Sequence, residues 1–326
     1  MEWTVAIGID THRDLHVAVA LDRLGRLLGS LEFAVDEHGF AELVRFARSL
    51  GQPTFAIEGT GSYGASLARA LLAEGLLVYE CERPERRSRK GKNDLLDAEA
   101  AARRLLSGQR LPLPRSGAGR EQLRLLLAER RSAQRSRLQA LNQLQAALVS
   151  LDPPLRARLS RLTPAALERE PLLPRPLLAP LRRLSKRIRL LEGELCEIDA
   201  ELGELTRALC PQLLAETGIG PLCSAQLLVS AADPSRLRSE ASFAALAGVS
   251  PIEASSGQVK RHRLNRGGDR QLNWALHMSA LNRIRHHPET RAYYERLLSK
   301  GKTKREAIRI VKRVLARRLY RTLVAA

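Results

Sequence analysis

The chain has 326 residues, with 54 Lys and Arg against 35 Asp and Glu, and its formal net charge of +19 predicts a polyanionic partner. Only 4% of the residues are aromatic, which argues against an RNA-recognition sheet that stacks bases. The four cysteines form no C-x-x-C pair and no apolar run approaches the ~20 residues of a membrane span, so we expect a cytoplasmic protein without zinc, disulfides or a membrane partner.

The charge is distributed unevenly along the chain. Residues 1–80 hold 6 basic and 11 acidic side chains, a net of −5, whereas residues 251–326 hold 19 and 5, a net of +14. The length predicts more than one domain. We expect a catalytic domain over 1–110, a linker region over 111–209 and a C-terminal domain over 210–326, with metal chemistry and nucleic-acid binding divided between the two ends.

The first hundred residues alternate between strand and helix patterns. Apolar and β-branched runs predict five strands, at 4–9, 15–21, 27–35, 54–57 and 76–79. A helix is expected after each of the last three strands. The order βββαβαβα is that of the ribonuclease H-like fold. In that α/β layout the first and fourth strands are neighbours and the fifth lies at the edge of the sheet.

Four carboxylates are predicted to converge in this layout. Asp10 and Glu58 end the first and fourth strands, so neighbouring strands place them side by side. Asp94 and Asp97 are three residues apart and share one face of the helix after the fifth strand. Carboxylates suit one or two Mg²⁺ ions acting on a phosphodiester, so all four are predicted metal ligands and catalytic residues. A basic loop precedes Asp94 and is predicted to hold the phosphate backbone: Arg87, Arg89, Lys90 and Lys92.

These acids also have simpler interpretations. Asp94 can be the N-cap of its helix, and Asp97 can be a first-turn acid that complements the helix dipole. Asp10 and Glu58 can be solvated strand ends. Four other acids compete for the metal site: Asp14, Asp22, Glu80 and Glu99. Asp14 is the best placed of them, although it lies beyond the end of the first strand.

Two long helices are predicted beyond a Pro/Gly/Ser-rich linker at 109–119. Leucines at three- and four-residue spacings give apolar stripes to 120–151 and 181–209, and a proline-studded segment at 152–180 breaks the helix between them. We expect an antiparallel hairpin or coiled coil that also dimerises. The pattern leaves open whether the seam closes within one chain or between two.

The C-terminal region is predicted to be mainly helical and basic. The pattern helix, Gly218-Ile219-Gly220-Pro221, helix is typical of a helix-hairpin-helix, in which Gly218 and Gly220 let the backbone approach a phosphate. A loop with Ser255-Ser256-Gly257 precedes helices expected at 271–285 and 304–323. Cations in and after this loop are predicted to contact phosphates: Lys260, Arg261, Arg263, Arg266 and Arg270.

The order and spacing of these motifs resemble those of a known family, the DEDD transposases of insertion-sequence family 110, which are related to Piv-type DNA invertases. The motifs that carry the resemblance are Gly8-Ile9-Asp10 with His12, Ile57-Glu58-Gly59-Thr60-Gly61-Ser62, Lys92-Asn93-Asp94-Leu95-Leu96-Asp97-Ala98, Gly218-Ile219-Gly220-Pro221, Gly248-Val249-Ser250-Pro251, Ser255-Ser256-Gly257 and Arg266-Gly267-Gly268-Asp269. One departure is Ser250, where the family usually has Leu or Val before the proline.

The resemblance implies a RuvC-like N-terminal domain, a coiled-coil linker and a C-terminal transposase domain. It implies Mg²⁺-dependent cleavage, exchange and rejoining of DNA strands, with a structured bridge RNA joining donor and target DNA. The four carboxylates map to the family's DEDD set, and its serine nucleophile maps to Ser256, with Ser255 as the adjacent alternative. Because recombination cuts four strands, we expect a homo-oligomer, either a dimer or a tetramer.

Other functions stay open at this point. A junction-resolving nuclease would use the carboxylates without Ser256, and a site-specific invertase of the Piv type would resemble the transposase closely. A non-catalytic nucleic-acid-binding protein would tolerate the loss of Asp10. A tyrosine recombinase using Tyr293 or Tyr294 would leave the carboxylates without a purpose.

Overall fold

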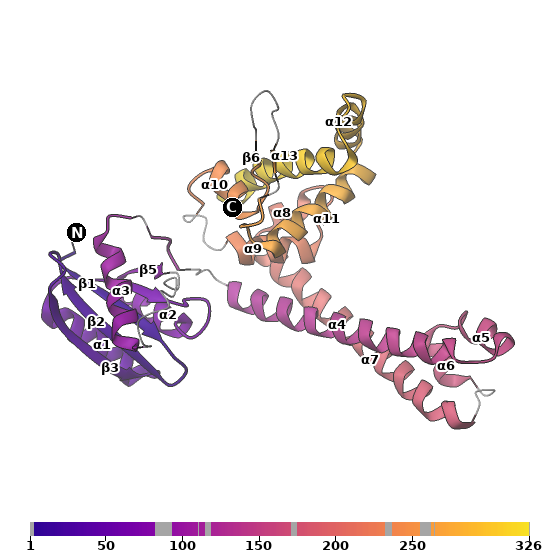
Figure 1. Ribbon diagram of the computed structural model, residues 1–326, viewed down its shortest axis with the longest axis horizontal. Helices are drawn as coiled ribbons and strands as arrows, with labels where there is room; N and C mark the ends of the chain where they lie inside the picture. Colours follow the sequence, from indigo (N-terminus) through magenta and orange to yellow (C-terminus); the bar gives the residue numbers. More distant parts are fainter. Residues whose placement is uncertain are drawn as a thin grey trace. The chain divides into compact units, whose positions relative to one another are not determined.

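The computed structural model describes residues 3–81, 93–109, 111–114, 119–170, 175–231, 237–254, 262–263 and 265–325. The chain divides into an N-terminal unit, Met1–Ser116, and a C-terminal unit, Gly117–Ala326 (Figure 1). Several predicted site residues lie outside the described ranges: Arg87, Arg89, Lys90, Lys92, Ser255, Ser256, Lys260 and Arg261.

The N-terminal unit is a five-stranded mixed sheet with helices on both faces. Its elements follow the predicted βββαβαβα order: β1 Val5–Thr11, β2 Leu15–Asp22, β3 Leu27–Ala34, α1 Glu37–Leu50, β4 Pro53–Glu58, α2 Ala65–Ala73, β5 Leu77–Cys81 and α3 Asp94–Leu106. The strands lie in the order β3-β2-β1-β4-β5, with β1 antiparallel to β2 and parallel to β4. The predictions that the first and fourth strands are neighbours and that the fifth is an edge strand are confirmed.

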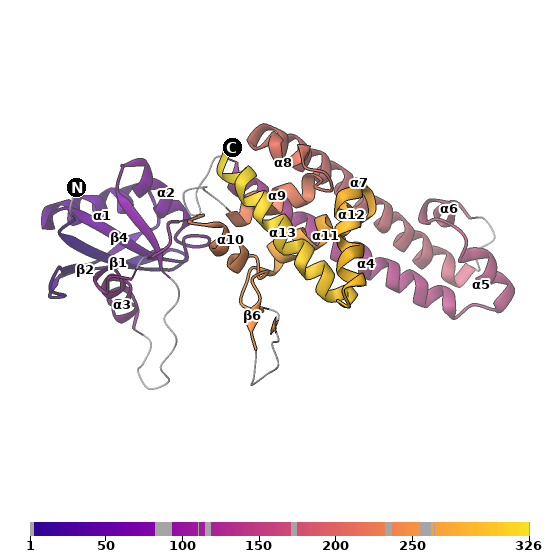
Figure 2. The same ribbon diagram turned by 90° about the horizontal axis from the view of Figure 1, so that it is seen from above.

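Alternation along β1 decides which of its side chains face which helices. Ile7 is fully buried in a core with Leu43 of α1 and Leu67 of α2. Gly8 faces the other way, toward α3, and Figure 2 shows α3 on the side of the sheet opposite α1 and α2. Asp10, two residues beyond Gly8, therefore points to the α3 side as well.

Gly8→Ala is expected to destabilise the N-terminal unit strongly. The added Cβ would lie 2.0 Å from the carbonyl oxygen of Ala98 and 2.2 Å from the backbone nitrogen of Ala102, so α3 would have to move. We expect the free energy of unfolding to fall by about 3 kcal/mol or more in urea denaturation. Gly61→Ala is the control, since nothing lies within 4 Å of its added Cβ. Equal effects of the two changes would contradict the direct packing of α3 on β1.

The described part of the C-terminal unit is helical apart from one short hairpin. Its elements are α4 Arg120–Val149, α5 Pro153–Leu159, α6 Pro164–Arg169, α7 Arg175–Leu209, α8 Pro211–Ala215, α9 Pro221–Ala231, α10 Glu240–Leu246, β6 Ile252–Glu253, β7 His262–Arg263, α11 Arg270–His286, α12 Pro288–Ser299 and α13 Lys304–Ala325. The long helices α4 and α7 run side by side (Figure 1), as predicted for a helical hairpin. Among the described helices, none has the length and apolarity to cross a membrane.

Helices also occupy the segment at 152–180, where a break was predicted. Pro153 and Pro164 begin α5 and α6, where a proline costs little because the first helical N–H has no partner within the helix. Leu159 and Leu167 are buried in one core with residues of α4 and α7. The prolines therefore start two short helices that close the end of the hairpin.

Candidate metal centre

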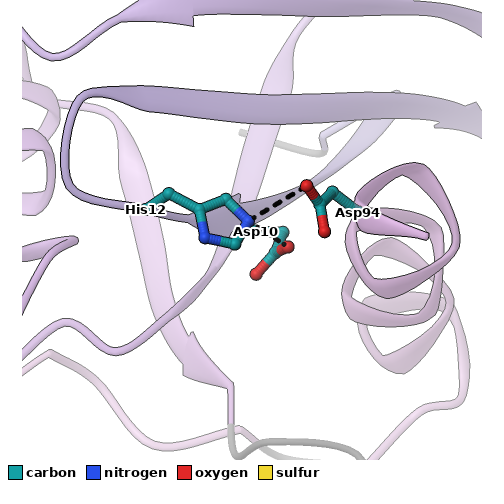
Figure 3. Close-up of side chains that lie close together, drawn as sticks. All are labelled: Asp10, His12 and Asp94. Carbon is teal, nitrogen blue, oxygen red and sulfur yellow. Dashed lines mark ion pairs between the residues drawn. The ribbon is translucent and has the colours of Figure 1, made fainter. Parts of the chain in front are cut away.

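Asp10 and Asp94 meet at the carboxyl end of β1. Asp10 points to the α3 side, and α3 begins at Asp94, four residues before the Ala98 that packs on Gly8. Nε2 of His12 lies between the two acids, 3.1 Å from Oδ2 of Asp10 and 3.3 Å from Oδ2 of Asp94 (Figure 3). One ligand atom from each of the three side chains lies within 4.8 Å of the others, a spacing suited to holding a metal ion.

Asn93, rather than Asp94, caps the N-terminus of α3. Oδ1 of Asn93 accepts a hydrogen bond from the backbone N–H of Leu95 at 3.0 Å. The interpretation of Asp94 as the N-cap is therefore wrong, because the cap lies one residue earlier. The Asp94 carboxylate, with its side chain 43% exposed, is left at the open side of the cluster.

Glu58 lies on the same face of the sheet as Asp10. It ends β4, whose Ile57 pairs with Ile9 of β1, so the next position along each strand holds Glu58 and Asp10. Ala56, two residues before Glu58, packs with Ala101 of α3, and strand alternation places Glu58 on that side too. Its backbone carbonyl accepts a hydrogen bond from the Thr11 hydroxyl at 2.9 Å.

The electrostatics of the site centre on Asp10, which is buried. Burial raises the pKa of Asp10 above its ordinary value, His12 lowers it, and the charges of Glu58, Asp94 and Asp97 raise it further. All four predicted carboxylates are therefore close enough to interact. Asp10 and Asp94 belong to the three-residue cluster, whereas Glu58 and Asp97 lie outside it. Their roles as ligands stay predictions.

His12 is a site residue to which the sequence analysis gave no role. Its backbone N–H donates to Nδ1 of His16 at 3.2 Å, and this holds the turn after β1. His16 is fully buried against Phe33 and Phe40, and burial lowers its pKa, which favours the neutral ring that can accept this bond. The sequence offered two signals for His12: its place two residues after Asp10, and its part in the Gly8-Ile9-Asp10 motif that carries the family resemblance.

The nucleic-acid-binding residues predicted in the C-terminal unit are partly described. Gly218 has φ +84°, and a Cβ there would lie 2.7 Å from Cγ of Arg283, so its packing against α11 already requires glycine. Open space surrounds the position of a Cβ on Gly220. The described cations of the predicted loop are exposed: Arg263, Arg266 and Arg270. Their contacts with nucleic acid stay predictions.

Comparison with known proteins matches both ends of the chain. A DEDD transposase family model of the IS110 type matches residues 7–153, and the model described as "Transposase IS116/IS110/IS902 family" matches residues 210–295. The IS110 insertion element 43.6 kDa protein of Streptomyces coelicolor is 34% identical over 114 residues, covering 34% of this chain and 28% of that protein. The IS900 insertion element 42 kDa protein of Mycobacterium paratuberculosis is 31% identical over 130 residues, covering 39% of this chain and 33% of that protein.

A longer match comes from Sinorhizobium fredii. The protein named "Putative transposase y4rJ" is 29% identical over 310 residues, covering 84% of this chain and 75% of that protein. The two family models together cover both the carboxylate motifs and the glycine motifs of the C-terminal unit. The chain belongs to the IS110 family of insertion-sequence transposases.

Proposed function

We propose that the chain cuts, exchanges and rejoins DNA strands during the transposition of an insertion element, using a divalent metal ion. The observation that carries this proposal is the meeting of Asp10, His12 and Asp94 at the end of β1. The strand order, with β1 parallel to β4 and antiparallel to β2, supports a ribonuclease H-like, RuvC-like fold for the N-terminal unit.

The residues at this site fit a metal ion. Nε2 of His12 is buried, and no atom of the described residues gives it a hydrogen bond of suitable geometry, although two carboxylate oxygens lie within 3.3 Å. Ligand atoms that converge at ion-pair distance, with no hydrogen bond of suitable geometry at Nε2, suit a shared cation. Burial raises the pKa of Asp10 most, and repulsion from the neighbouring acids adds to this; a cation would offset both effects.

We infer that the metal is Mg²⁺, with two ions per site held by four carboxylates: Asp10, Glu58, Asp94 and Asp97. When bound, Mg²⁺ supplies positive charge at the scissile phosphate and lowers the pKa of the attacking group. The carboxylates fix that charge in place, and the burial of Asp10 keeps water from weakening their effect.

The remaining parts of the proposal concern the nucleophile and the partners. Ser256 lies in the connection between β6 and β7 and is proposed as the nucleophile, with donor and target DNA as substrates and a bridge RNA joining them. Gly218 and Gly220 are proposed to belong to a helix-hairpin-helix that approaches a phosphate, although α8 before them has only five residues. Tyr293 and Tyr294 pack against the C-terminal core, which favours a structural role for both.

A homo-oligomer is proposed because several active sites must act together. The α4–α7 hairpin buries one face of each helix but leaves large apolar side chains exposed on both: Leu125, Leu138 and Leu190. Such residues suit contact with a second copy. We propose three functional regions, with catalysis at 1–110, a coiled-coil linker at 111–209 and the transposase domain at 210–326.

DNA binding is expected to depend strongly on salt. Residues 251–326 carry a net charge of +14, and each phosphate that a cation neutralises releases counterions. With about six phosphate contacts, affinity should fall roughly 10³-fold between about 50 and 200 mM salt. Fluorescence anisotropy with a labelled duplex measures this, and a flat response would mean that the charge does not serve nucleic-acid binding. Cleavage of the same DNA with Mg²⁺, and its loss in EDTA, tests the catalytic part.

A further inference from the structure

A cavity in the C-terminal unit lies at the base of the β6–β7 hairpin. Its volume is ≈ 480 Å³, and its walls come from the turn before β6, the residues around β7, and α13 with the turn before it. Its charged lining is five cations and one carboxylate: Arg263, Lys302, Arg309, Lys312, Arg313 and Glu306. Apolar side chains such as Val249 and Ile310 line the rest.

Two of these charges already have partners. Arg313 pairs with Glu240 at 3.1 Å, outside the cavity lining. The Glu306 carboxylate accepts hydrogen bonds from the backbone N–H and the hydroxyl of Thr303, at 2.9 and 2.8 Å, where α13 begins. These bonds come from neutral groups and leave the Glu306 charge in place, and the charges of Lys302 and Arg309 also act on it. Apart from the paired Arg313, the cavity therefore holds four cations against one carboxylate: Arg263, Lys302, Arg309 and Lys312 against Glu306.

Lys312 is buried, with only 6% of its surface exposed. Its Nζ donates a hydrogen bond to Oδ1 of Asn273 at 2.6 Å, and no carboxylate of the described residues lies within 4 Å of it. Burial lowers the pKa of Lys312 to about 8, and the charge of Arg309 adds to this. The Lys312 charge also contributes to lowering the pKa of His277, after burial. A buried charge without an anion destabilises a fold, so stability does not explain this lysine.

Asn273 connects Lys312 to the base of the hairpin. Its Nδ2 donates to the carbonyl oxygen of Ala247 at 2.7 Å, immediately before Gly248. Gly248 packs against Gly268 so closely that a Cβ on Gly268 would lie 2.3 Å from the Gly248 nitrogen. The amine is thus linked through Asn273 to the segment before β6, and this segment packs on Gly268 in the segment after β7.

We propose that this cavity binds one nucleotide of a DNA strand through its backbone phosphate, with Lys312 and Arg309 as donors. A phosphate supplies the anion that Lys312 lacks, and charge-assisted bonds to it are strong. The volume and the apolar wall suit the sugar and base of an unstacked nucleotide. The inference rests on the proposed function, because the nucleotide held here would belong to the DNA on which the proposed enzyme acts.

The test is fluorescence anisotropy of the full chain with a labelled single-stranded DNA, over a range of salt concentrations. Lys312→Met should weaken binding about tenfold and reduce the salt slope by about 0.7, the value for one phosphate of a single strand. Its melting temperature should stay the same or rise, because an uncompensated charge is removed. Arg309→Gln, at an exposed position, should weaken binding similarly. Lys304 is exposed on α13 and lies outside the cavity lining, so Lys304→Met should change neither the affinity for the strand nor the salt slope.

Three outcomes would overturn the inference. The inference is overturned if Lys312→Met and Arg309→Gln both bind DNA as tightly as the wild type. If cleavage still depends on Asp10 in that case, the proposed function stands. If the two variants lose affinity for an RNA strand of the same sequence but not for the DNA strand, the cavity is assigned to RNA. Equal competition by inorganic phosphate and by deoxyadenosine monophosphate would show a site for the phosphate ion alone. Failure of the wild type to bind any DNA would instead contradict the proposed function.

Discussion

Replacing Asp10 by Asn is expected to abolish strand cleavage and to stabilise the metal-free protein. Cleavage should fall about 10³-fold or more, since the change removes a proposed metal ligand and, with it, several kcal/mol of charge stabilisation. The stability effect follows from the raised pKa of Asp10. Between its ordinary pKa of 3.8 and the raised value, the native state binds more protons than the unfolded state, so stability falls as pH rises through that window. At neutral pH the ionised carboxylate is therefore a cost that Asn removes.

The measurement is the melting temperature with and without Mg²⁺, beside cleavage of a labelled DNA. Mg²⁺ at about 100 times its dissociation constant should stabilise the wild type by about 3 kcal/mol and Asp10→Asn much less. Asp14→Asn is the matched control, because the Asp14 side chain is 87% exposed and lies beyond the end of β1. If Asp14→Asn loses cleavage and Asp10→Asn keeps it, the metal centre has been assigned to the wrong acid.

The sheet could be predicted because its signals are local and repeated. Continuous apolar runs predicted buried strands, and β1, β2 and β4 are the most buried strands of the sheet. The element order then limited the topology to one in which β1 and β4 are neighbours. Strand alternation relates Asp10 to Gly8 and Glu58 to Ala56, and the pairing of Ile9 with Ile57 then places both acids on one face.

The details of the site depend on geometry that no spacing rule encodes. Asn93 and Asp94 are both good N-caps by residue type, and only the backbone conformation shows that Asn93 takes the role. His12 follows the last residue of β1, where alternation no longer fixes the direction of a side chain, and its position depends on the bond to His16. Lys312 sits among arginines in a basic helix, and its sequence gives no sign that it is buried.

Replacing Ser256 by Ala is expected to abolish a covalent protein–DNA adduct. A phosphoserine ester would conserve the energy of the broken phosphodiester, so strands could be exchanged and resealed without ATP, whereas hydrolysis would leave breaks. A serine hydroxyl needs activation near neutral pH, and no histidine or carboxylate stands directly beside Ser256 in the sequence. The groups that activate it are therefore expected to be the carboxylates of the N-terminal unit, and the adduct should require Asp10 as well.

The measurement is denaturing electrophoresis of the protein after incubation with labelled DNA and Mg²⁺. The wild type should give a band that contains both protein and label, and Ser256→Ala and Asp10→Ala should each lose it. Ser255→Ala is the control at the adjacent position and should keep the adduct. The reverse result would move the nucleophile by one residue. If neither serine matters and free nicked DNA accumulates, then water is the nucleophile and the chain acts as a junction-resolving nuclease. Hydrolysis at the proposed carboxylate centre would break the strand without conserving the energy of its phosphodiester bond.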